Sequence, residues 1–267
     1  MPGVKALQRP ARAMLASART ARRLRALRIP LDAPFPEDAY RSVADAFAMH
    51  VGRRIASVLD VGANFGQCSS FLAVRHAIPP TEVVCVEAHP DLAAYLAANH
   101  PFTVINGAVG LLEEDRVFFA RHVTWDRTRL WDVLRGRVPT NNRPGMSSLL
   151  IHQQDGNADV AEVRVPGIRL SSIIDERGRG FDFAKIDVEG AALEALHSLG
   201  SSIEMIGSIH IEAETREIWA GQSLWPEISS RLDRAGFEMV LYRLDRHFLQ
   251  CESFWIRRTW IRSFLDT

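Results

Sequence analysis

The segment VLDVGANFG, from Val58 to Gly66, limits the fold of this chain more than any other part of its sequence. A short apolar run that ends in an acid is typical of a buried strand, and here a glycine-rich turn follows it. Glycine suits such a turn because its backbone adopts positive φ angles and lets a ligand approach the main chain closely. Since Gln67 to His76 continues as a helix, the segment predicts a strand, a ligand-binding turn and a helix in succession.

The alternation of strand and helix continues along the chain. Six further short runs have the composition of strands: Glu82 to Glu87, Phe102 to Ile105, Phe181 to Asp187, Met205 to Glu212, Phe237 to Leu241 and Glu252 to Ile256. Further helices are expected over Glu37 to Val51, Asp91 to Asn99, Gly190 to Leu199 and Trp225 to Ala235. Strands that alternate with helices form a parallel sheet covered on both faces. The sequence therefore predicts an α/β, Rossmann-like fold with a mostly parallel seven-stranded sheet and an antiparallel C-terminal strand.

This alternation breaks in the middle of the chain. Arg116 to Arg121 and Val160 to Val165 each have the pattern of a strand, and a polar stretch from His122 to Gly145 follows the first of them. We expect that stretch to be an ordered lid or a mobile insertion. A length of 267 residues suits one α/β domain with such an insertion, so residues 37–267 are expected to form a single domain.

The first 36 residues differ in charge from the rest. Every charged residue from Met1 to Pro30 is positive, whereas the whole chain balances 32 Lys and Arg against 32 Asp and Glu. That balance gives no overall attraction to nucleic acid, and no apolar run is long enough for a signal peptide core or a membrane span. We expect a basic extension that is a solvated helix, a surface for anionic lipid or an organelle transit peptide. The expected location is the cytoplasm, with peripheral membrane contact as an alternative.

Three cysteines, Cys68, Cys85 and Cys251, lie far apart and show no zinc-type spacing. Buried thiols in a reducing compartment are therefore expected.

The glycine turn itself indicates what kind of cofactor binds. Gly62 and Gly66 flank Asn64 in the pattern G-x-N-x-G, whereas a dinucleotide site uses G-x-G-x-x-G to bring a pyrophosphate close to the helix. The turn therefore favours a cofactor without phosphate. Glu87 ends the second strand, 25 positions after Gly62, where a carboxylate accepts hydrogen bonds from a ribose diol. Asp60 is expected to face the positive end of the cofactor. S-adenosylmethionine has both a ribose diol and a cationic tail.

Five blocks of the sequence, in order, resemble the FkbM family of methyltransferases. They are VLDVGANFG (Val58 to Gly66), VEAHP (Val86 to Pro90), NGAVG (Asn106 to Gly110), MSSL (Met146 to Leu149) and FAKIDVEGAALEAL (Phe183 to Leu196). The resemblance runs from about Ser57 to Glu212, and KIDVEG is its most specific part. It implies a class I methyltransferase fold and methyl transfer from S-adenosylmethionine to oxygen, often on a sugar or glycan hydroxyl.

The turn, the strand-end acid and this resemblance together give a set of expected cofactor-binding residues. They are Asp60, Gly62, Ala63, Asn64, Gly66, Gln67, Glu87, Ala88, Asn106, Gly107, Ala108 and Asp187. By the resemblance, Asn106 and Ala108 would flank the adenine. A structural ion pair for Glu87 and a turn cap for Asp60 are the alternatives.

Catalytic residues are expected beyond the carboxyl ends of the strands, where open α/β sheets bind ligands. Asp187 and Glu189 follow one such strand and Glu212 ends the next. A hydroxyl acceptor needs a base or a metal because its own pKa is far above neutral. Either one of these carboxylates or His210 removes the proton, or the three acids bind Mg²⁺, or they are structural. Lys185 shares a strand face with Asp187 and is expected to pair with it and hold the site in shape.

The acceptor side of the site is expected near the polar insertion. Ser147 and Ser148 are expected to contact the acceptor or the cofactor, an ordinary turn being the alternative. Trp125 and Trp131 are expected to stack on a sugar face, with packing of the insertion as the alternative. The leading hypothesis is an S-adenosylmethionine-dependent O-methyltransferase for a small-molecule or glycan hydroxyl. An NAD-dependent oxidoreductase and a cofactor-binding scaffold without activity are the alternatives.

Overall fold

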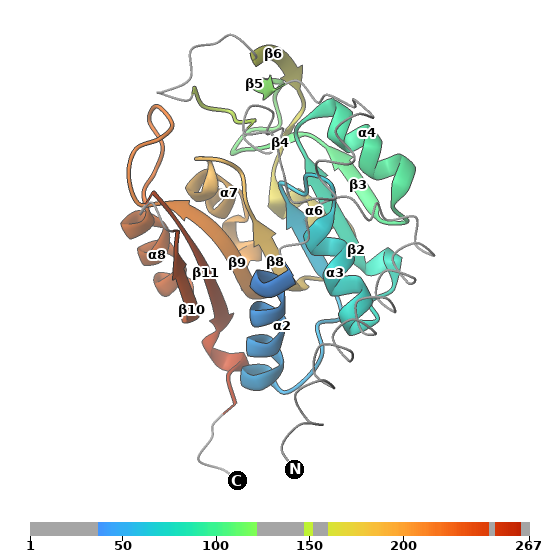
Figure 1. Cartoon of the computed structure of the whole chain (residues 1–267), viewed down its shortest axis with the longest axis vertical. Coiled ribbons are helices and arrows are strands. Elements are labelled where there is room, and N and C mark those ends of the chain that lie inside the picture. Colours follow the sequence, from blue (N-terminus) through green and yellow to red (C-terminus); the bar gives the residue numbers. More distant parts are fainter. Residues whose placement is uncertain (1–36, 122–146, 152–159, 246–248, 263–267) are drawn as a thin grey trace, which may run out of the picture.

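The computed structural model describes residues 37–121, 147–151, 160–245 and 249–262. A seven-stranded sheet runs through the middle of the described chain (Figure 1). In order across the sheet, its strands are β3 (Thr103–Asn106), β2 (Val83–Glu87), β1 (Val58–Val61), β8 (Phe181–Ile186), β9 (Ile206–Glu214), β11 (Gln250–Arg257) and β10 (Phe237–Leu244). Of these seven, β11 runs antiparallel to both neighbours and the other paired strands are parallel. The expected seven-stranded, mostly parallel sheet with an antiparallel C-terminal strand is confirmed.

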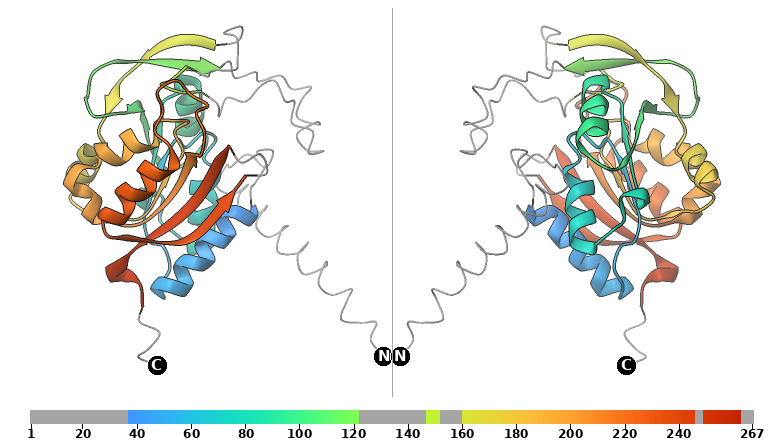
Figure 2. Two further views of the ribbon diagram at one scale, coloured as in Figure 1. Left: turned by 90° about the vertical axis from the view of Figure 1, so that its left-hand side faces the viewer. Right: turned by 90° about the vertical axis from the view of Figure 1, so that its right-hand side faces the viewer.

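Two layers of helices cover this sheet, one on each face (Figure 2). One layer holds α2 (Glu37–Val51), α3 (Gln67–His76) and α4 (Pro90–Asn99), and the other holds α6 (Leu170–Arg177), α7 (Ala192–Ser198) and α8 (Trp225–Arg234). Because both faces are covered, β1 and β2 are continuously buried, as the apolar runs VLDV and VVCVE predict. None of the helices in the described ranges has the length and apolarity needed to cross a bilayer.

Alternate residues of each strand face different helix layers. On β1, Leu59 and Val61 pack in the core under α6, α7 and α8, whereas Val58 packs under α2 and α3. Asp60 lies between Leu59 and Val61 in the sequence and therefore points to the other face of the sheet. There its side chain binds Ser69 of α3. This alternation decides which polar side chains lie together near the carboxyl ends of the strands.

The order of the strands reverses at β1. From β1 the chain moves outward to β2 and β3, and it later returns to place β8 on the opposite side of β1. A crevice forms at such a reversal because the helices that follow the two central strands, α3 after β1 and α7 after β8, lie on opposite faces of the sheet. The topology therefore places a ligand site beyond Val61 and Ile186.

Two small sheets lie beyond that edge, at the top of Figure 1. β4 (Ala108–Val109) pairs in parallel with β7 (Gly167–Ile168), and β5 (Arg116–Arg121) pairs antiparallel with β6 (Val160–Val165). The two strands expected around the polar insertion are thus confirmed. The expected lid itself, with Trp125 and Trp131, lies outside the described residues, as does the basic extension of residues 1–36.

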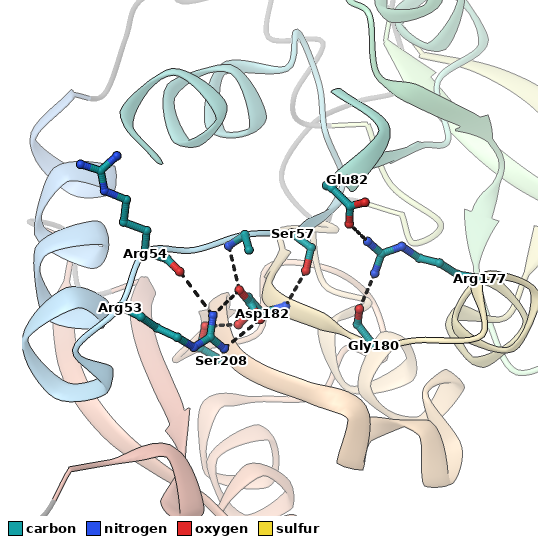
Figure 3. A network of polar contacts seen from close by, with 9 residues as sticks. Arg53, Arg54, Ser57, Glu82, Arg177, Gly180, Asp182 and Ser208 are labelled. Carbon is teal, nitrogen blue, oxygen red and sulfur yellow. Dashed lines mark hydrogen bonds and ion pairs between the residues drawn. The ribbon is translucent and has the colours of Figure 1, made fainter. Parts of the chain in front are cut away.

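Ion pairs and hydrogen bonds connect the segments at the opposite end of the sheet (Figure 3). Asp182, near the start of β8, accepts two hydrogen bonds from the Arg53 guanidinium, at 2.6 and 2.9 Å, and its backbone N–H donates to the Ser57 hydroxyl. Arg177 binds Glu82 beside them. Bidentate pairs of this kind fix geometry, so we assign this end of the sheet a structural role.

Candidate active site

A pocket opens at the carboxyl ends of β1, β2 and β8, where the strand order reverses. The space within it is about 600 Å³, open solvent included. Seven of the expected cofactor-binding residues line it: Gly62, Asn64, Glu87, Ala88, Gly107, Ala108 and Asp187. Loops far apart in the sequence therefore converge on one cavity, as the strand ends predict.

The glycine turn after β1 has the backbone geometry that its sequence requires. Gly62, Asn64 and Gly66 all have positive φ, at 75°, 53° and 76°. A Cβ atom on Gly62 would lie 1.7 Å from the carbonyl oxygen of Asp187. Only glycine fits there, because the turn after β1 passes directly against the turn after β8.

Glu87 joins the end of β2 to this turn. One carboxylate oxygen accepts the backbone N–H of Asn64 at 2.7 Å, and the other accepts the N–H of His89 at 2.8 Å. Burial raises the pKa of Glu87, and the two N–H groups partly offset that shift. Each oxygen keeps a further lone pair for a ligand in the pocket. Asn64 adds a buried side-chain oxygen that has no hydrogen-bond partner among the described residues.

Asp60 has a different environment from the one expected. It is fully buried, and one carboxylate oxygen accepts hydrogen bonds from the backbone N–H and hydroxyl of Ser69, at 3.2 and 2.5 Å. Its other oxygen lies 3.8 Å from the Lys185 ammonium. Asp60 is not among the residues that line the pocket, so it holds α3 and Lys185 in place, and direct contact with a cofactor stays a prediction.

Four further expected residues are likewise not among those that line the pocket: Ala63, Gly66, Gln67 and Asn106. Asn106 donates to the backbone oxygens of Glu87 and Ala88, at 2.9 and 3.2 Å, and so fixes the loop after β2. Asn106 thus helps to shape the pocket, and its expected contact with the adenine stays a prediction.

The two serines after the polar insertion have separate environments. Ser147 lines the pocket, and its hydroxyl accepts the backbone N–H of Arg121 at 3.0 Å. Ser148 is buried, and its hydroxyl donates to the backbone oxygen of Glu189 at 2.6 Å. Ser148 therefore ties residues 147–151 to the turn after β8, and Ser147 is the one placed to contact a ligand.

Asp187, Glu189 and Glu212 come together at the side of the pocket. One carboxylate oxygen from each lies within 4.8 Å of the other two. Asp187 and Glu189 also line the pocket, whereas Glu212 lies one strand further away, on β9. Burial, with the neighbouring Asp187, raises the pKa of both Glu189 and Glu212 well above the usual value. The group can therefore hold either a proton or a cation.

Lys185 pairs with Asp187, as the strand alternation predicts. Its ammonium lies 3.0 Å from the Asp187 carboxylate and donates to the backbone oxygen of Gly62 at 3.1 Å. Burial by itself lowers the pKa of Lys185, but Asp187, Tyr40 and Asp60 together raise it well above its usual value. The side chain thus stays charged and fixes the two central turns relative to each other.

His210 lies deeper in the sheet than the acids. It is 5% exposed, its ring meets Tyr40 of α2 edge-on at 6.0 Å, and it does not line the pocket. Burial, reinforced by the Lys185 charge, lowers its pKa to about 4. The imidazole is therefore neutral near pH 7, and its role as the base stays a prediction that this buried position does not favour.

Two acids that sequence reasoning did not assign to the site lie beside these groups. Glu214 is 2% exposed, and burial raises its pKa to about 7. Glu252 lies directly opposite Glu212 in the β9–β11 register. The alternation of Glu212 and Glu214 along one strand could have indicated the first. The second depends on strand pairing that the sequence does not reveal.

The comparisons with known proteins bear on this whole region. Residues 60–239 match the model of the methyltransferase FkbM domain, from β1 into β10, and the match includes the pocket and the three clustered acids. No curated protein matches the chain.

Several solved structures are also similar to the chain. The methyltransferase FkbM from Methylobacillus flagellatus KT is 16% identical, with a TM-score of 0.43 over 75% of this chain and 43% of that one. The O-methyltransferase from Bacillus cereus, in complex with S-adenosylhomocysteine, is 12% identical, with a TM-score of 0.44 over 90% of both chains. Magnesium protoporphyrin IX methyltransferase from Synechocystis PCC 6803, with bound S-adenosylmethionine, is 13% identical, with a TM-score of 0.41 over 83% of this chain and 79% of that one.

Proposed function

Because the chain belongs to the FkbM methyltransferase family and is an S-adenosylmethionine-dependent methyltransferase, we propose that it methylates a hydroxyl oxygen of a sugar, glycan or glycoconjugate. The observation that carries the proposal is that Asp187 and Glu189 line the same pocket as Glu87. Groups able to accept a proton thus share one cavity with the acid suited to a ribose diol.

The residues of the pocket fit S-adenosylmethionine. Glu87 has one free lone pair on each carboxylate oxygen for the ribose diol, and the buried Asn64 side-chain oxygen needs a donor. Gly107 and Ala108 offer a small, apolar surface for the adenine. When bound, the cofactor supplies a methyl group on a cationic sulfur, and the carboxylates of Asp187 and Glu189 are of the sign that attracts such a charge.

The acids near the expected position of the methyl group suit an acceptor with a hydroxyl oxygen. A hydroxyl becomes a competent nucleophile only when a base accepts its proton as the new bond forms. Burial and the neighbouring Asp187 raise the pKa of Glu189, which makes its carboxylate a stronger base than a solvent-exposed one. Lys185 acts as a positioning residue, because its ammonium fixes the Asp187 carboxylate at 3.0 Å.

A sugar suits this part of the pocket because it brings several hydroxyl donors. Asp187, Glu189 and Glu212 together present six carboxylate oxygens, each an acceptor when ionised. The pocket also contains Ser147, whose hydroxyl can donate and accept. A polyol can therefore satisfy several of these groups at once, whereas an apolar acceptor would leave them without partners.

The test is methyl transfer from S-adenosylmethionine labelled on the methyl group to a panel of sugars, glycolipids, amines and carboxylic acids. We expect label on a sugar hydroxyl, located by mass spectrometry and NMR, with Glu87→Ala as a variant that loses transfer through lost cofactor binding. Label only on nitrogen or on a carboxylate would disprove the oxygen assignment. Binding of NADH in place of S-adenosylhomocysteine would disprove the whole cofactor assignment.

A further inference from the structure

We propose that Asp187, Glu189 and Glu212 form a binding site for a hard divalent cation, such as Mg²⁺ or Mn²⁺, at the side of the cofactor pocket. One carboxylate oxygen from each residue lies within 4.8 Å of the other two. Such cations prefer oxygen ligands at about 2.0–2.6 Å, so three oxygens this close together can share one ion. Water and an acceptor hydroxyl would complete its coordination.

The pairing of β8 with β9 and the turn after β8 already place these three residues together. β8 and β9 pair in parallel with Ile186 opposite Ile211, which sets Asp187 beside Glu212. Glu189 then turns back with a φ of 44°, and the Ser148 hydroxyl holds its backbone oxygen at 2.6 Å. The three carboxylates are therefore held by a strand pair and a fixed turn.

A buried acid next to the group gives a second, independent indication of a missing ligand. Glu214 lies two residues after Glu212 on β9, so the two side chains share one face of the strand. The Glu214 side chain is 2% exposed, yet one of its carboxylate oxygens has no hydrogen-bond partner among the described residues. A buried oxygen without a partner is costly, and a cation or its bound water would satisfy it.

The local charges also require compensation. Lys185 is the buried cation of this region, and its ion pairs are to Asp60 and Asp187. Within the described ranges, neither Glu189 nor Glu212 has an ion-pair partner, although both are partly buried. Several close carboxylates cannot all ionise unless protons or a cation neutralise them. A divalent ion bound between the three side chains provides that neutralisation.

A cation at this position could also activate the acceptor. Because Asp187 and Glu189 line the pocket, an ion held by them can polarise an acceptor hydroxyl and lower its pKa. The hydroxyl proton then passes to a neighbouring carboxylate, a C–O bond forms to the methyl carbon, and the electron pair of the broken C–S bond stays on sulfur. Two adjacent hydroxyls can bind one ion together, so this site favours vicinal diols. This use rests on the proposed oxygen acceptor, whereas binding of the ion does not.

The first test is Mn²⁺ binding, measured by calorimetry and electron paramagnetic resonance, on full-length protein freed of metal with EDTA and without cofactor or acceptor. We expect one site in the natural protein. Asp187→Asn, Glu189→Gln and Glu212→Gln should each weaken binding at least tenfold. Glu217→Gln, at an exposed acid in the loop after β9, is the matched control and should bind as the natural protein does.

Thermal unfolding shows whether each variant is folded, so that lost binding is not mistaken for lost structure. In EDTA, Glu189→Gln and Glu212→Gln should unfold at or above the temperature of the natural protein, because each removes one like charge from the group. Asp187→Asn also removes an ion partner of the buried Lys185, so it should unfold at a lower temperature, and only its response to Mn²⁺ is compared. Mn²⁺ should raise the unfolding temperature of the natural protein and of Glu217→Gln but not of the three variants. Absence of Mn²⁺ and Mg²⁺ binding at millimolar concentration, or undiminished binding in all three variants, would overturn the site. Failure to methylate hydroxyls would instead overturn the proposed function and leave this result intact.

Discussion

The carboxylate of Glu87, at the end of β2, accepts the backbone N–H of Asn64 in the turn after β1 at 2.7 Å. This bond joins the two sequence elements from which a cofactor site was inferred, although 23 positions separate them. It also fixes the acid so that its remaining lone pairs are oriented before a ligand binds, which reduces the entropy lost on binding.

We therefore expect Glu87→Ala to weaken S-adenosylhomocysteine binding by about 1–3 kcal/mol, because ligand hydroxyls and the Asn64 N–H both lose a charged acceptor. Isothermal calorimetry measures the change. Glu204→Ala, at an exposed acid far along the chain, serves as the control and should bind as the natural protein does. Equal affinity in the Glu87 variant would remove this residue from the binding site.

The close approach of two turns makes Gly62 a second test. Alanine at this position must adopt a φ near 75° and place its Cβ against the Asp187 carbonyl oxygen. The backbone conformation alone costs about 1–2 kcal/mol, and the forced rearrangement adds about 1–3 kcal/mol. Gly221→Ala is a matched control, since Gly221 has a φ of 74° and an added methyl group there would have no atom of the described residues within 4 Å. Urea unfolding should show the larger loss for Gly62→Ala, and equal losses would show that the turns can separate freely.

Much of this architecture could be predicted because it depends on local sequence. Parallel strands covered on both faces are continuous apolar runs, so VLDV and VVCVE identify β1 and β2 directly. The carboxyl ends of adjacent parallel strands meet at one edge, which is why Glu87, Gly62 and Asp187 could be placed in one site before their contacts were known.

The parts that could not be predicted depend on pairing between distant segments. Glu252 joins the acids only because β11 pairs with β9 and places it opposite Glu212. The buried residues of α6, Leu170, Ile173 and Ile174, do have helical spacing, but a helix of 8 residues is shorter than the window of about 11–18 residues over which this period identifies a helix. The environment of Asp60 depends on which face of β1 the helix α3 covers, and its hydrogen-bond partner there, Ser69, lies nine positions later.

The buried pair of Lys185 and Asp60 gives a third prediction, on stability. Lys185→Met removes the cation and leaves the fully buried Asp60 carboxylate without its ion partner. Breaking a buried pair in this way costs about 3–5 kcal/mol in the free energy of unfolding. Adding Asp60→Asn to that variant should restore part of the loss, since no charge is then left buried. Chemical denaturation of both single variants and the double variant measures the coupling; simple additivity of the two losses would mean that the residues do not interact.

A fourth prediction concerns acid stability. Burial lowers the pKa of His76, at the end of α3, to about 4, with Arg75 acting in the same direction. The folded state therefore binds fewer protons than the unfolded state, whose histidine titrates near 6.5. The stabilisation is complete above pH 6.5 and is lost as the pH falls from 6.5 toward 4. The free energy of unfolding should decrease over this interval, and His76→Phe should make the decrease smaller. An identical slope in both proteins would show that His76 is accessible to protons in the folded state.

The fifth prediction separates catalysis from binding at Asp187. This residue lines the pocket, meets the Lys185 ammonium at 3.0 Å and lies within 4.8 Å of Glu189 and Glu212. Asparagine has the size of the aspartate side chain and keeps one acceptor oxygen. It can neither accept the hydroxyl proton nor hold a cation as a carboxylate does. We expect Asp187→Asn to lower kcat by about 10²–10⁴, the usual contribution of a positioned base, with S-adenosylhomocysteine affinity changed only a few-fold.

The control for that experiment is Asp182→Asn, at the opposite end of the same strand, where the carboxylate binds Arg53 rather than the pocket. It should lower stability without lowering kcat in the folded fraction. Single-turnover kinetics at saturating cofactor distinguish the two variants, because they report the transfer step apart from binding and product release. A natural rate in Asp187→Asn would exclude this carboxylate both as the base and as an essential cation ligand. Of the remaining candidates for the base, Glu189 lines the pocket, whereas Glu212 and His210 do not, so Glu189 would be the next residue to substitute.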